Sequence, residues 1–470
     1  MKNTAPIRPK IGLLALTLEL YETLAPGLRE ERERWLRRKV LPALEPVADV
    51  VFDKAVFRRQ DIEAQVSLFQ SRDVDALLVV LLTYSPSQLA LPALKRTRLP
   101  IIVWNTQELF AVDESFAQAA MISNHGVHGT QDLCNVLLRS GVRFEYVTSH
   151  LSDERALGVL EDFFRAAAAV HRLQSARLGL IGYPFPGMGD FALDTTSMAA
   201  TLGCEWLNIP VEDYVNRAAR AGAKAVAALV STYRREYEIA PGVTDEDVEA
   251  TARVELAVRG MVSDHRLDAL TYQFMAFGED ERTPTVPFVA ASRLMAEGIG
   301  FGGEGDLIAA AGTTLLNWLN PPATFSEIFT TDFAGNSLFM SHMGEVNVAM
   351  ARKDRKARMV ARATPITRTR AGQLALVASL EPGPATLCAL TVGPGGRWRL
   401  IASPVVVEDW GPLESMRVPH FKVAPRGGVR EFLTAYAKAG GPHHNAVCFG
   451  DARGRVKIAA DLLGGDYCEI

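Results

Sequence analysis

The sequence has few cysteines and no pattern of a disulfide-rich protein. Its 470 residues include only five cysteines, and they are widely spaced, form no C-x-x-C pair and leave an odd count: Cys134, Cys204, Cys388, Cys448 and Cys468. This pattern indicates reduced thiols rather than a disulfide framework. Because disulfides are rare in the cytoplasm, we expect a cytoplasmic protein.

Long apolar runs and an excess of positive charge are also missing. The apolar segment IGLLALTLEL is interrupted by Glu19, Tyr21 and Glu22, which argues against a signal-peptide core. No window reaches the ~18 uninterrupted apolar residues that a membrane span needs. The formal net charge is −4, with 50 Lys and Arg against 54 Asp and Glu. We therefore expect neither a membrane nor nucleic acid as a partner.

The composition, 48% hydrophobic and 22% charged, is typical of a globular chain, and 470 residues suggest about three domains. In the first part of the chain, short apolar runs alternate with stretches whose apolar residues recur at helical spacing. The expected strands are 11–18, 47–52, 76–82 and 100–104. This alternation predicts an N-terminal Rossmann-like α/β domain over residues 1–175.

The alternation returns after residue 175 and gives way to a different pattern near residue 320. Strand-like segments at 177–185, 205–209 and 268–274 and a long helix at 245–264 predict a second Rossmann-like domain over 176–320. Beyond it, β-branched runs broken by Gly and Pro, such as VNVAMA, ATLCALTVGPGG and HFKVAP, predict a β-rich, antiparallel barrel-like domain over 321–470. The expected fold class is α/β, with two doubly wound domains followed by the β-rich one.

Three short segments concentrate metal-binding side chains among glycines and apolar residues. They are GIGFGGEGD, TFSEIFTTDFAGNSLFMSHMGEVN and AGGPHHNAV, and their candidate ligands are Glu304, Asp306, Glu327, Asp332, His342, Glu345, His443 and His444. Carboxylates and imidazoles without thiolates suit a hard or borderline ion such as Mn²⁺, Co²⁺ or Mg²⁺. The pattern predicts one catalytic or regulatory metal site at the junction of the second and third domains.

Each segment also has a simpler explanation. Gly300, Gly302 and Gly305 form a G-x-G-x-x-G, but a helix-like stretch precedes it and Glu304 would face a pyrophosphate, which argues against a dinucleotide site. The same glycines could end one helix and turn into the next. Taken alone, each histidine could belong to the core or to a polar loop.

The segments RLMAEGIGFGGEGD, TFSEIF…AGNSLFMSHMGEV and AGGPHHN resemble, in this order, the metal-site segments of L-arabinose isomerases. The pair Leu20–Tyr21 near the N-terminus also fits, so the resemblance covers nearly the whole chain. Asp332 is an alternative ligand, at a position where the family has none. The resemblance implies four ligands of a divalent ion, with Mn²⁺ the first candidate: Glu304, Glu327, His342 and His444.

The resemblance further implies an aldose–ketose isomerase that acts on an L-arabinose-like pentose or a related small sugar. Moving a hydrogen between C1 and C2 requires an electrophile on the two oxygens and an acid/base group beside the open chain. Glu304 and Glu327 are the expected catalytic residues, working through an enediol. The alternatives are a metal-dependent epimerase of a ketose or sugar acid, and a non-catalytic sugar-binding relative.

Other positions are implied as substrate contacts: His443, His125, Met188 and Phe325. His128 is a rival for the role of His125. The resemblance also implies a homo-oligomer, a hexamer, in which His125 of one subunit completes the pocket of another. Leu18 stands where the family has a glutamine, so the substrate need not be the family's own pentose.

The basic segment ARKDRKARMVARATPITRTR, residues 351–370, could suggest contact with phosphate or nucleic acid. Its charges are interspersed with Asp354 and with residues typical of strands. We therefore expect a solvated strand face or a patch at a subunit interface.

Overall fold

The structure, a computed structural model, describes residues 7–470. It divides into two compact units, an N-terminal unit of residues 7–171 and a C-terminal unit of residues 172–470. No helix among residues 7–470 is long and apolar enough to cross a membrane. All five cysteines carry unpaired thiols.

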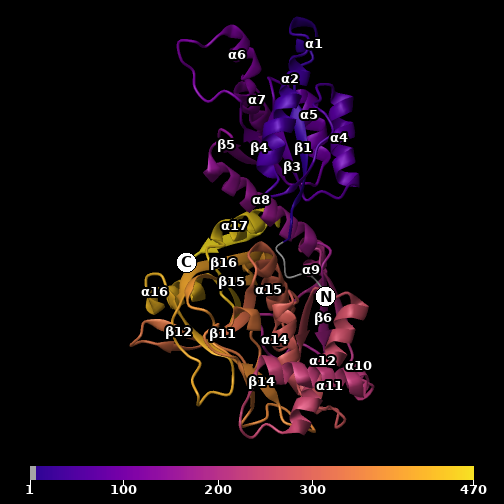
Figure 1. The fold of residues 1–470 in the computed structure, drawn as a ribbon, viewed down its shortest axis with the longest axis vertical. Coiled ribbons are helices and arrows are strands. Elements are labelled where there is room, and N and C mark those ends of the chain that lie inside the picture. Colours follow the sequence, from indigo (N-terminus) through magenta and orange to yellow (C-terminus); the bar gives the residue numbers. More distant parts are fainter. Residues whose placement is uncertain (1–6) are drawn as a thin grey trace. The chain divides into compact units, whose positions relative to one another are not determined.

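The N-terminal unit is built on a five-stranded parallel sheet of order β2-β1-β3-β4-β5, seen in indigo and purple in Figure 1. Its central strand β3 is buried at every position, because helices cover both faces of a doubly wound sheet. The strands are β1 (Lys10–Leu16), β2 (Asp49–Val51), β3 (Ala76–Leu81), β4 (Ile101–Asn105) and β5 (Glu145–Thr148). The main helices are α2 (Leu28–Trp35), α4 (Arg59–Ser71), α5 (Ser87–Arg96), α6 (Gln118–Ser123) and α7 (Gly126–Arg139).

The helix α8 (Glu154–Leu173) leads into the C-terminal unit, which begins with a second parallel sheet of order β10-β9-β6-β7. These strands are β6 (Arg177–Ile181), β7 (Glu205–Ile209), β9 (Ala269–Tyr272) and β10 (Gly300–Gly302). The helices of this part are α9 (Thr195–Thr201), α10 (Val211–Ala219), α11 (Ala223–Glu236), α12 (Asp245–His265), α13 (Phe274–Gly278), α14 (Phe288–Ala296) and α15 (Leu307–Leu319). A small sheet joins β8 (Glu238–Ile239), β13 (Arg358–Ala361) and β14 (Leu374–Val377).

An antiparallel barrel completes the C-terminal unit. Its strand order is β15-β18-β11-β12-β17-β16, and pairing of β15 with β16 closes it, while β19 (Asp466–Glu469) adds to β16 in parallel. The barrel strands are β11 (Ala323–Asp332), β12 (Ser337–Ser341), β15 (Gly383–Val392), β16 (Trp398–Val407), β17 (His420–Pro425) and β18 (His444–Phe449). Two helices, α16 (Val429–Lys438) and α17 (Arg453–Leu462), flank it. The predicted fold class is confirmed.

Two local predictions from the sequence differ from the structure. VNVAMA is not a strand, because Asn347 caps a short 3₁₀ helix, Val348–Met350, through the backbone N–H of Ala349. The glycine-rich motif contains a short strand, β10, which pairs with β9. Gly298 ends the preceding helix with φ of 86°, as the helix-end interpretation expects.

Helix α15 lies between the second parallel sheet and the barrel, and it packs against β9 and β10 on one side and β15 and β18 on the other. It is apolar on nearly all sides, as expected for a helix buried all round. Close packing requires glycine in β10: a Cβ at Gly300 would lie 1.8 Å from the Thr314 hydroxyl oxygen. Strand β10 is therefore packed closely against α15.

Candidate metal centre

The four ligands predicted from the sequence come together inside the C-terminal unit. Glu304 lies in the loop between β10 and α15, and Glu327 lies on β11. His342 directly follows β12, and His444 begins β18. In the barrel register, Glu327 is opposite Ser341 on β12 and opposite His444 on β18. Three neighbouring strands thus carry three of the four side chains to one end of the sheet.

Two overlapping groups of side chains have the spacing that a metal ion requires. The ligand atoms of Glu327, His342 and His444 all lie within 4.8 Å of one another, and so do those of Glu304, His443 and His444. His444 belongs to both groups and is 2% exposed. The arrangement describes one centre with His444 in its middle.

The two buried imidazoles are held in the same way, each by a carboxylate at its Nδ1 atom. His342 Nδ1 is 2.7 Å from Glu345 Oε2, and His444 Nδ1 is 2.9 Å from Asp306 Oδ2. Each carboxylate accepts a hydrogen bond from the Nδ1–H of its histidine, which leaves the lone pair on Nε2. Both Nε2 atoms are buried and have no hydrogen-bond partner. Buried polar atoms are rarely left unpaired, so these two lone pairs fit an ion held between the histidines.

Carboxylate pairing also changes the protonation of His342. Burial opposes a positive charge there, but the adjacent Glu345, followed by Glu327 and Glu304, outweighs it and raises the pKa of His342. A divalent ion on Nε2 would compensate the same negative charge without a proton. The donor set of two carboxylates and two imidazoles suits Mn²⁺, Co²⁺ or Mg²⁺, and the residues present fit such an ion.

The loop that carries Glu304 has an uncommon backbone. Glu304 has φ of 58°, in the left-handed region, and only 7% of its surface is exposed. The neighbouring Gly303 lies so near His342 that a Cβ would be 2.7 Å from the imidazole Cε1 and Nε2 atoms. Strained backbone of this kind persists where the surroundings hold it, and functional sites are common among such places. Here it brings Glu304 Oε2 within 3.8 Å of His443 Nε2 and 3.7 Å of His444 Nε2.

The predicted substrate contacts of the C-terminal unit lie around this centre. His443 is partly exposed, and its Nδ1 is 2.5 Å from Asp190 in the loop after β6. Burial lowers the basicity of His443, but the carboxylates of Glu304 and Asp190 outweigh it and raise the pKa of His443 to about 9. Met188 is half-buried in the same loop as Asp190. This loop and the pair His443–His444 therefore lie side by side.

Phe325 has a different place from the one expected for a pocket wall. It is 1% exposed, and its ring meets His342 and His444 edge-on, with ring centroids 4.8 and 5.0 Å apart. Phe191 stacks on the ring of His444, with 5.6 Å between the ring centroids. Phe325 therefore supports the imidazoles from within the core.

His125 and His128 belong to the N-terminal unit, where they form a cluster at the carboxyl ends of the parallel strands. His125 Nε2 is 2.7 Å from the Tyr21 hydroxyl oxygen, and its ring lies 5.1 Å from that of His128. His128 in turn stacks on Tyr84. Burial, and then the neighbouring His128, lower the pKa of His125. Carboxyl ends of parallel strands are where open α/β sheets bind their ligands.

Asp332 and the basic segment 351–370 form ion pairs with neighbouring side chains. Asp332, the alternative ligand, lies at the far end of β11, where it forms an ion pair with Lys422. In the basic segment, arginines pair with nearby acids: Arg352 with Asp354 and Asp409, and Arg358 with Glu414. Ion pairs with acids at the surface thus engage part of this segment, and its interpretation as a solvated strand face or a patch at a subunit interface stays a prediction.

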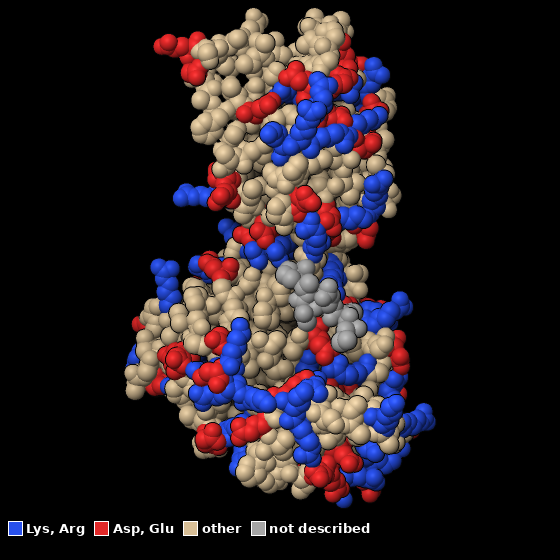
Figure 2. All heavy atoms as spheres, viewed as in Figure 1, with Lys and Arg blue, Asp and Glu red and all other residues tan. Residues whose placement is uncertain are grey.

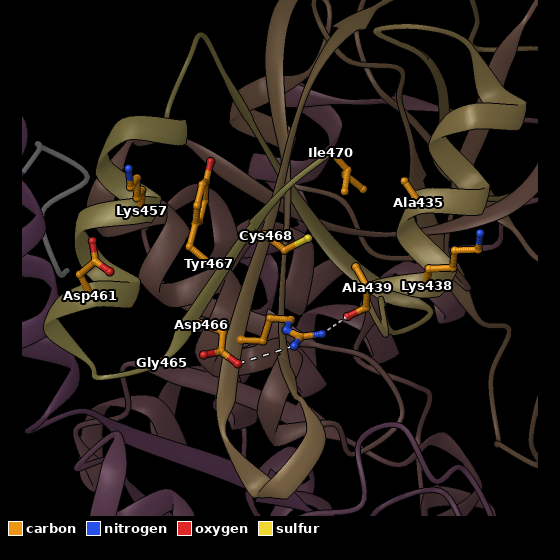
Figure 3. Close-up of a pocket in the computed structure, with 11 residues that line it drawn as sticks. Ala435, Lys438, Ala439, Lys457, Asp461, Gly465, Asp466, Tyr467, Cys468 and Ile470 are labelled. Carbon is orange, nitrogen blue, oxygen red and sulfur yellow. Dashed lines mark hydrogen bonds and ion pairs between the residues drawn. The ribbon is translucent and has the colours of Figure 1, made fainter.

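A large cavity lies apart from this chemistry, on the outside of the barrel. It has a volume of about 820 Å³ and is bordered by β19, α16 and α17 (Figure 3). Two of its charged side chains pair with each other, since Arg399 lies 3.6 Å from Asp466, and Arg399 also donates to the Ala439 carbonyl oxygen. None of the predicted site residues lines it.

Sequence reasoning did not assign roles to the residues that hold the histidines. Asp306 and Glu345 were recognised as possible ligands but not as partners of imidazoles, and Asp190 was not recognised at all. Glu345 could have been found from its spacing, three residues after His342 in the turn that follows β12. Asp306 could have been found as the residue just before a helix, where a carboxylate is favoured. Asp190 carries no such signal in the sequence.

Two parallel sheets covered by helices, a closed antiparallel barrel and a cluster of two glutamates and two histidines define an α/β protein whose C-terminal unit carries side chains that could hold a metal ion. The family models for the L-arabinose isomerase central domain and C-terminal domain match residues 192–320 and 322–465, more than half of the chain. The chain belongs to the L-arabinose isomerase family.

Individual relatives support this membership over most of the chain. An L-arabinose isomerase from Acidothermus cellulolyticus is 28% identical over 400 residues, 81% of this chain and 77% of the relative. One from Geobacillus kaustophilus is 26% identical over 454 residues, 92% of this chain and 87% of the relative. Among solved structures, a putative two-component response regulator covers 57% of this chain and 83% of its own, with 11% identity and a TM-score of 0.20, which is too low to bear on the fold.

Proposed function

We propose that this protein is an aldose–ketose isomerase that acts on a small sugar with the help of a divalent metal ion. Mn²⁺ is the first candidate for this ion, and Co²⁺ and Mg²⁺ are the alternatives. Its L-arabinose isomerase relatives support the reaction class. The observation that best supports metal dependence is the pair of buried Nε2 atoms, on His342 and His444, that face two carboxylates and have no partner.

The residues around the centre match the needs of this reaction. Glu304, Glu327, His342 and His444 would hold a divalent ion, which would supply a positive charge to stabilise the negative charge that develops on the sugar oxygens. Glu304 and Glu327 would move the protons, one at C2 and the other on the oxygens. Burial opposes ionisation of Glu304, but the neighbouring histidines, His443 first, outweigh it and lower the pKa of Glu304, so Glu304 is ionised and able to accept a proton at neutral pH. His443, paired with Asp190, would bind a sugar hydroxyl.

The substrate is proposed as an L-arabinose-like pentose or a related sugar. Leu18 follows β1 in the N-terminal unit, on the same carboxyl edge of the sheet as Tyr21 and His125. A leucine there offers no hydrogen bond to a sugar hydroxyl, which favours a sugar with an apolar group at that position. Met188 would add apolar surface, whereas Phe325, which is 1% exposed, would support the two histidines from the core.

We further propose a homo-oligomer, a hexamer, in which the carboxyl edge of one N-terminal unit faces the metal centre of a neighbour. This edge exposes large apolar side chains, which is unusual for a surface that faces water alone. They are Leu20, Leu24, Phe110, Val112, Phe116, Met121 and Val127. Figure 2 shows mostly uncharged atoms near the short helix α1 (Tyr21–Leu24) and in the loop before α6, with acidic side chains at the tip of that loop. Five unpaired thiols support a cytoplasmic location.

The test is conversion of a panel of pentoses, hexoses and deoxysugars by the metal-loaded protein, with products identified by NMR. We expect aldose–ketose conversion of at least one sugar, loss of turnover on chelation, and recovery on addition of Mn²⁺. Turnover that survives full chelation would refute metal dependence. Products epimerised without a change of the carbonyl position would replace the isomerase by an epimerase.

A further inference from the structure

A buried tyrosine is joined to the candidate metal centre through a carboxylate. The Tyr272 hydroxyl donates to Glu345 Oε1 at 2.5 Å, while Glu345 Oε2 is 2.7 Å from His342 Nδ1 and also accepts from the Gly344 backbone N–H at 3.0 Å. Tyr272 is 2% exposed, as is Glu345. A continuous chain of hydrogen bonds therefore runs from the end of β9 to the imidazole of His342.

The two histidines are held by the same device with different anchors. Asp306, which holds His444, is fixed on its other oxygen by the backbone N–H of Ala309 at 2.8 Å, in the first turn of α15. Glu345, which holds His342, has no helix start to fix its second oxygen. Among the residues that the structure describes, the side chain that bonds this oxygen is Tyr272. Tyr272 thus takes the place that a backbone amide takes beside His444.

We propose that Tyr272 is a positioning residue for the metal centre, which acts through Glu345 to hold His342 with its Nε2 lone pair directed at the ion. The inference rests on the proposed metal dependence. Outer partners of metal-bound histidines fix the tautomer and the ring orientation, and their loss commonly weakens metal affinity 10- to 100-fold.

The chemistry of the phenol supports a donor in this position. Burial, reinforced by the negative charge of Glu345, raises the pKa of Tyr272 well above its usual value, so the hydroxyl keeps its proton. Removing the hydroxyl would leave Glu345 Oε1 buried without a partner, and a buried carboxylate in that state shifts or rotates to find one. Either movement turns His342 away from the orientation in which Nε2 is free.

The experiment measures Mn²⁺ binding alone, by titration followed with EPR, in the full chain after removal of metal. Tyr272→Phe is expected to raise the Kd for Mn²⁺ about tenfold. The matched control is Tyr233→Phe, which removes an equally buried hydroxyl that donates to the fully buried Glu255 at 2.6 Å, a carboxylate bound to arginines rather than to a histidine. We expect the control to lower the melting temperature of the metal-free protein similarly and to leave the Kd unchanged.

A double-mutant cycle tests the route through Glu345. Glu345→Gln should itself weaken Mn²⁺ binding, and Tyr272→Phe should add little to it, because both changes break one chain. Additive effects, an unchanged Kd in Tyr272→Phe, or equal weakening by Tyr233→Phe would each overturn the inference while leaving metal dependence in place. A wild-type protein that binds no Mn²⁺ under any tested condition would overturn both.

Discussion

Histidines at two places in the molecule have opposite hydrogen-bonding patterns. In the barrel, His342 and His444 each have Nδ1 fixed by a buried carboxylate and Nε2 without a partner. In the N-terminal unit, His125 has Nε2 bonded to the Tyr21 hydroxyl and Nδ1 buried without a partner. Carboxylate neighbours raise the pKa of His342, whereas burial and a second imidazole lower that of His125. The neighbours thus leave the Nε2 lone pairs of the first two histidines free, as the proposed metal ion requires, and favour the neutral form of His125.

The largest effect is expected from Glu304→Gln. The amide has nearly the shape of the carboxylate but can neither accept a proton nor balance the charge of an ion, so kcat should fall by about 10²- to 10⁴-fold. Steady-state kinetics with Mn²⁺ in excess measures it, together with circular dichroism as a check of folding. If the folded variant keeps wild-type kcat, Glu304 takes no part in proton transfer.

Asp306→Asn tests whether the carboxylate beside His444 matters as a charge. The amide can still cap α15, so the fold should persist, but the bond to His444 Nδ1 loses its charge. We expect the Kd for Mn²⁺ to rise about 10- to 100-fold. Isothermal titration calorimetry measures the change. Asp194→Asn, at the cap of α9, is the matched control, and it should leave the Kd unaltered.

His125→Ala tests the other side of the comparison. Because His125 is proposed to bind sugar and not metal, its loss should raise KM about tenfold, which corresponds to one hydrogen bond of ~1.4 kcal/mol. The Kd for Mn²⁺ should stay within twofold of wild type. A variant that loses Mn²⁺ affinity and keeps its KM would reverse the roles assigned to the two places.

The smallest effect concerns stability and pH. A histidine whose pKa is lowered by folding binds fewer protons in the folded state, so its contribution to stability is present above the unfolded pKa, about 6.5, and is lost as the pH falls. His125→Gln should therefore make the melting temperature of the metal-free protein fall less between pH 7.5 and 5.5, by about 1–2 °C. Differential scanning calorimetry across this range is the measurement. Identical slopes in the two proteins would show that the lowered pKa of His125 has no effect on stability.

Much of the fold follows from local patterns. Strands β7 and β17 coincide residue for residue with the apolar runs 205–209 and HFKVAP, since alternation and turn residues mark both ends. β10 could not be predicted, because its sequence, Gly-Phe-Gly, is unfavourable for a strand. Gly300 is required there by tertiary packing, since a larger residue would collide with Thr314. VNVAMA has the composition of a strand, but a side-chain cap at Asn347 determines its conformation.

For the candidate site, the sequence predicts residues better than partnerships. Motif order identified the four side chains that the structure brings together, because each lies in a distinctive glycine- or histidine-containing segment. The link between His444 and Asp306, 138 positions apart, depends on the docking of β18 against α15 and has no local trace. The same holds for Asp190 and His443, 253 positions apart. These contacts come from tertiary packing, which local propensity does not encode.

The double role of Asp306 has a consequence for refolding. One of its oxygens caps the first turn of α15, and the other accepts a hydrogen bond from His444 at the start of β18. The helix depends on local contacts and should form early, whereas β18 comes from a distant part of the chain and should pair later. The capacity to capture Mn²⁺ should therefore lag behind the recovery of helical circular dichroism. The time at which Mn²⁺ binding is recovered would then mark the completion of folding.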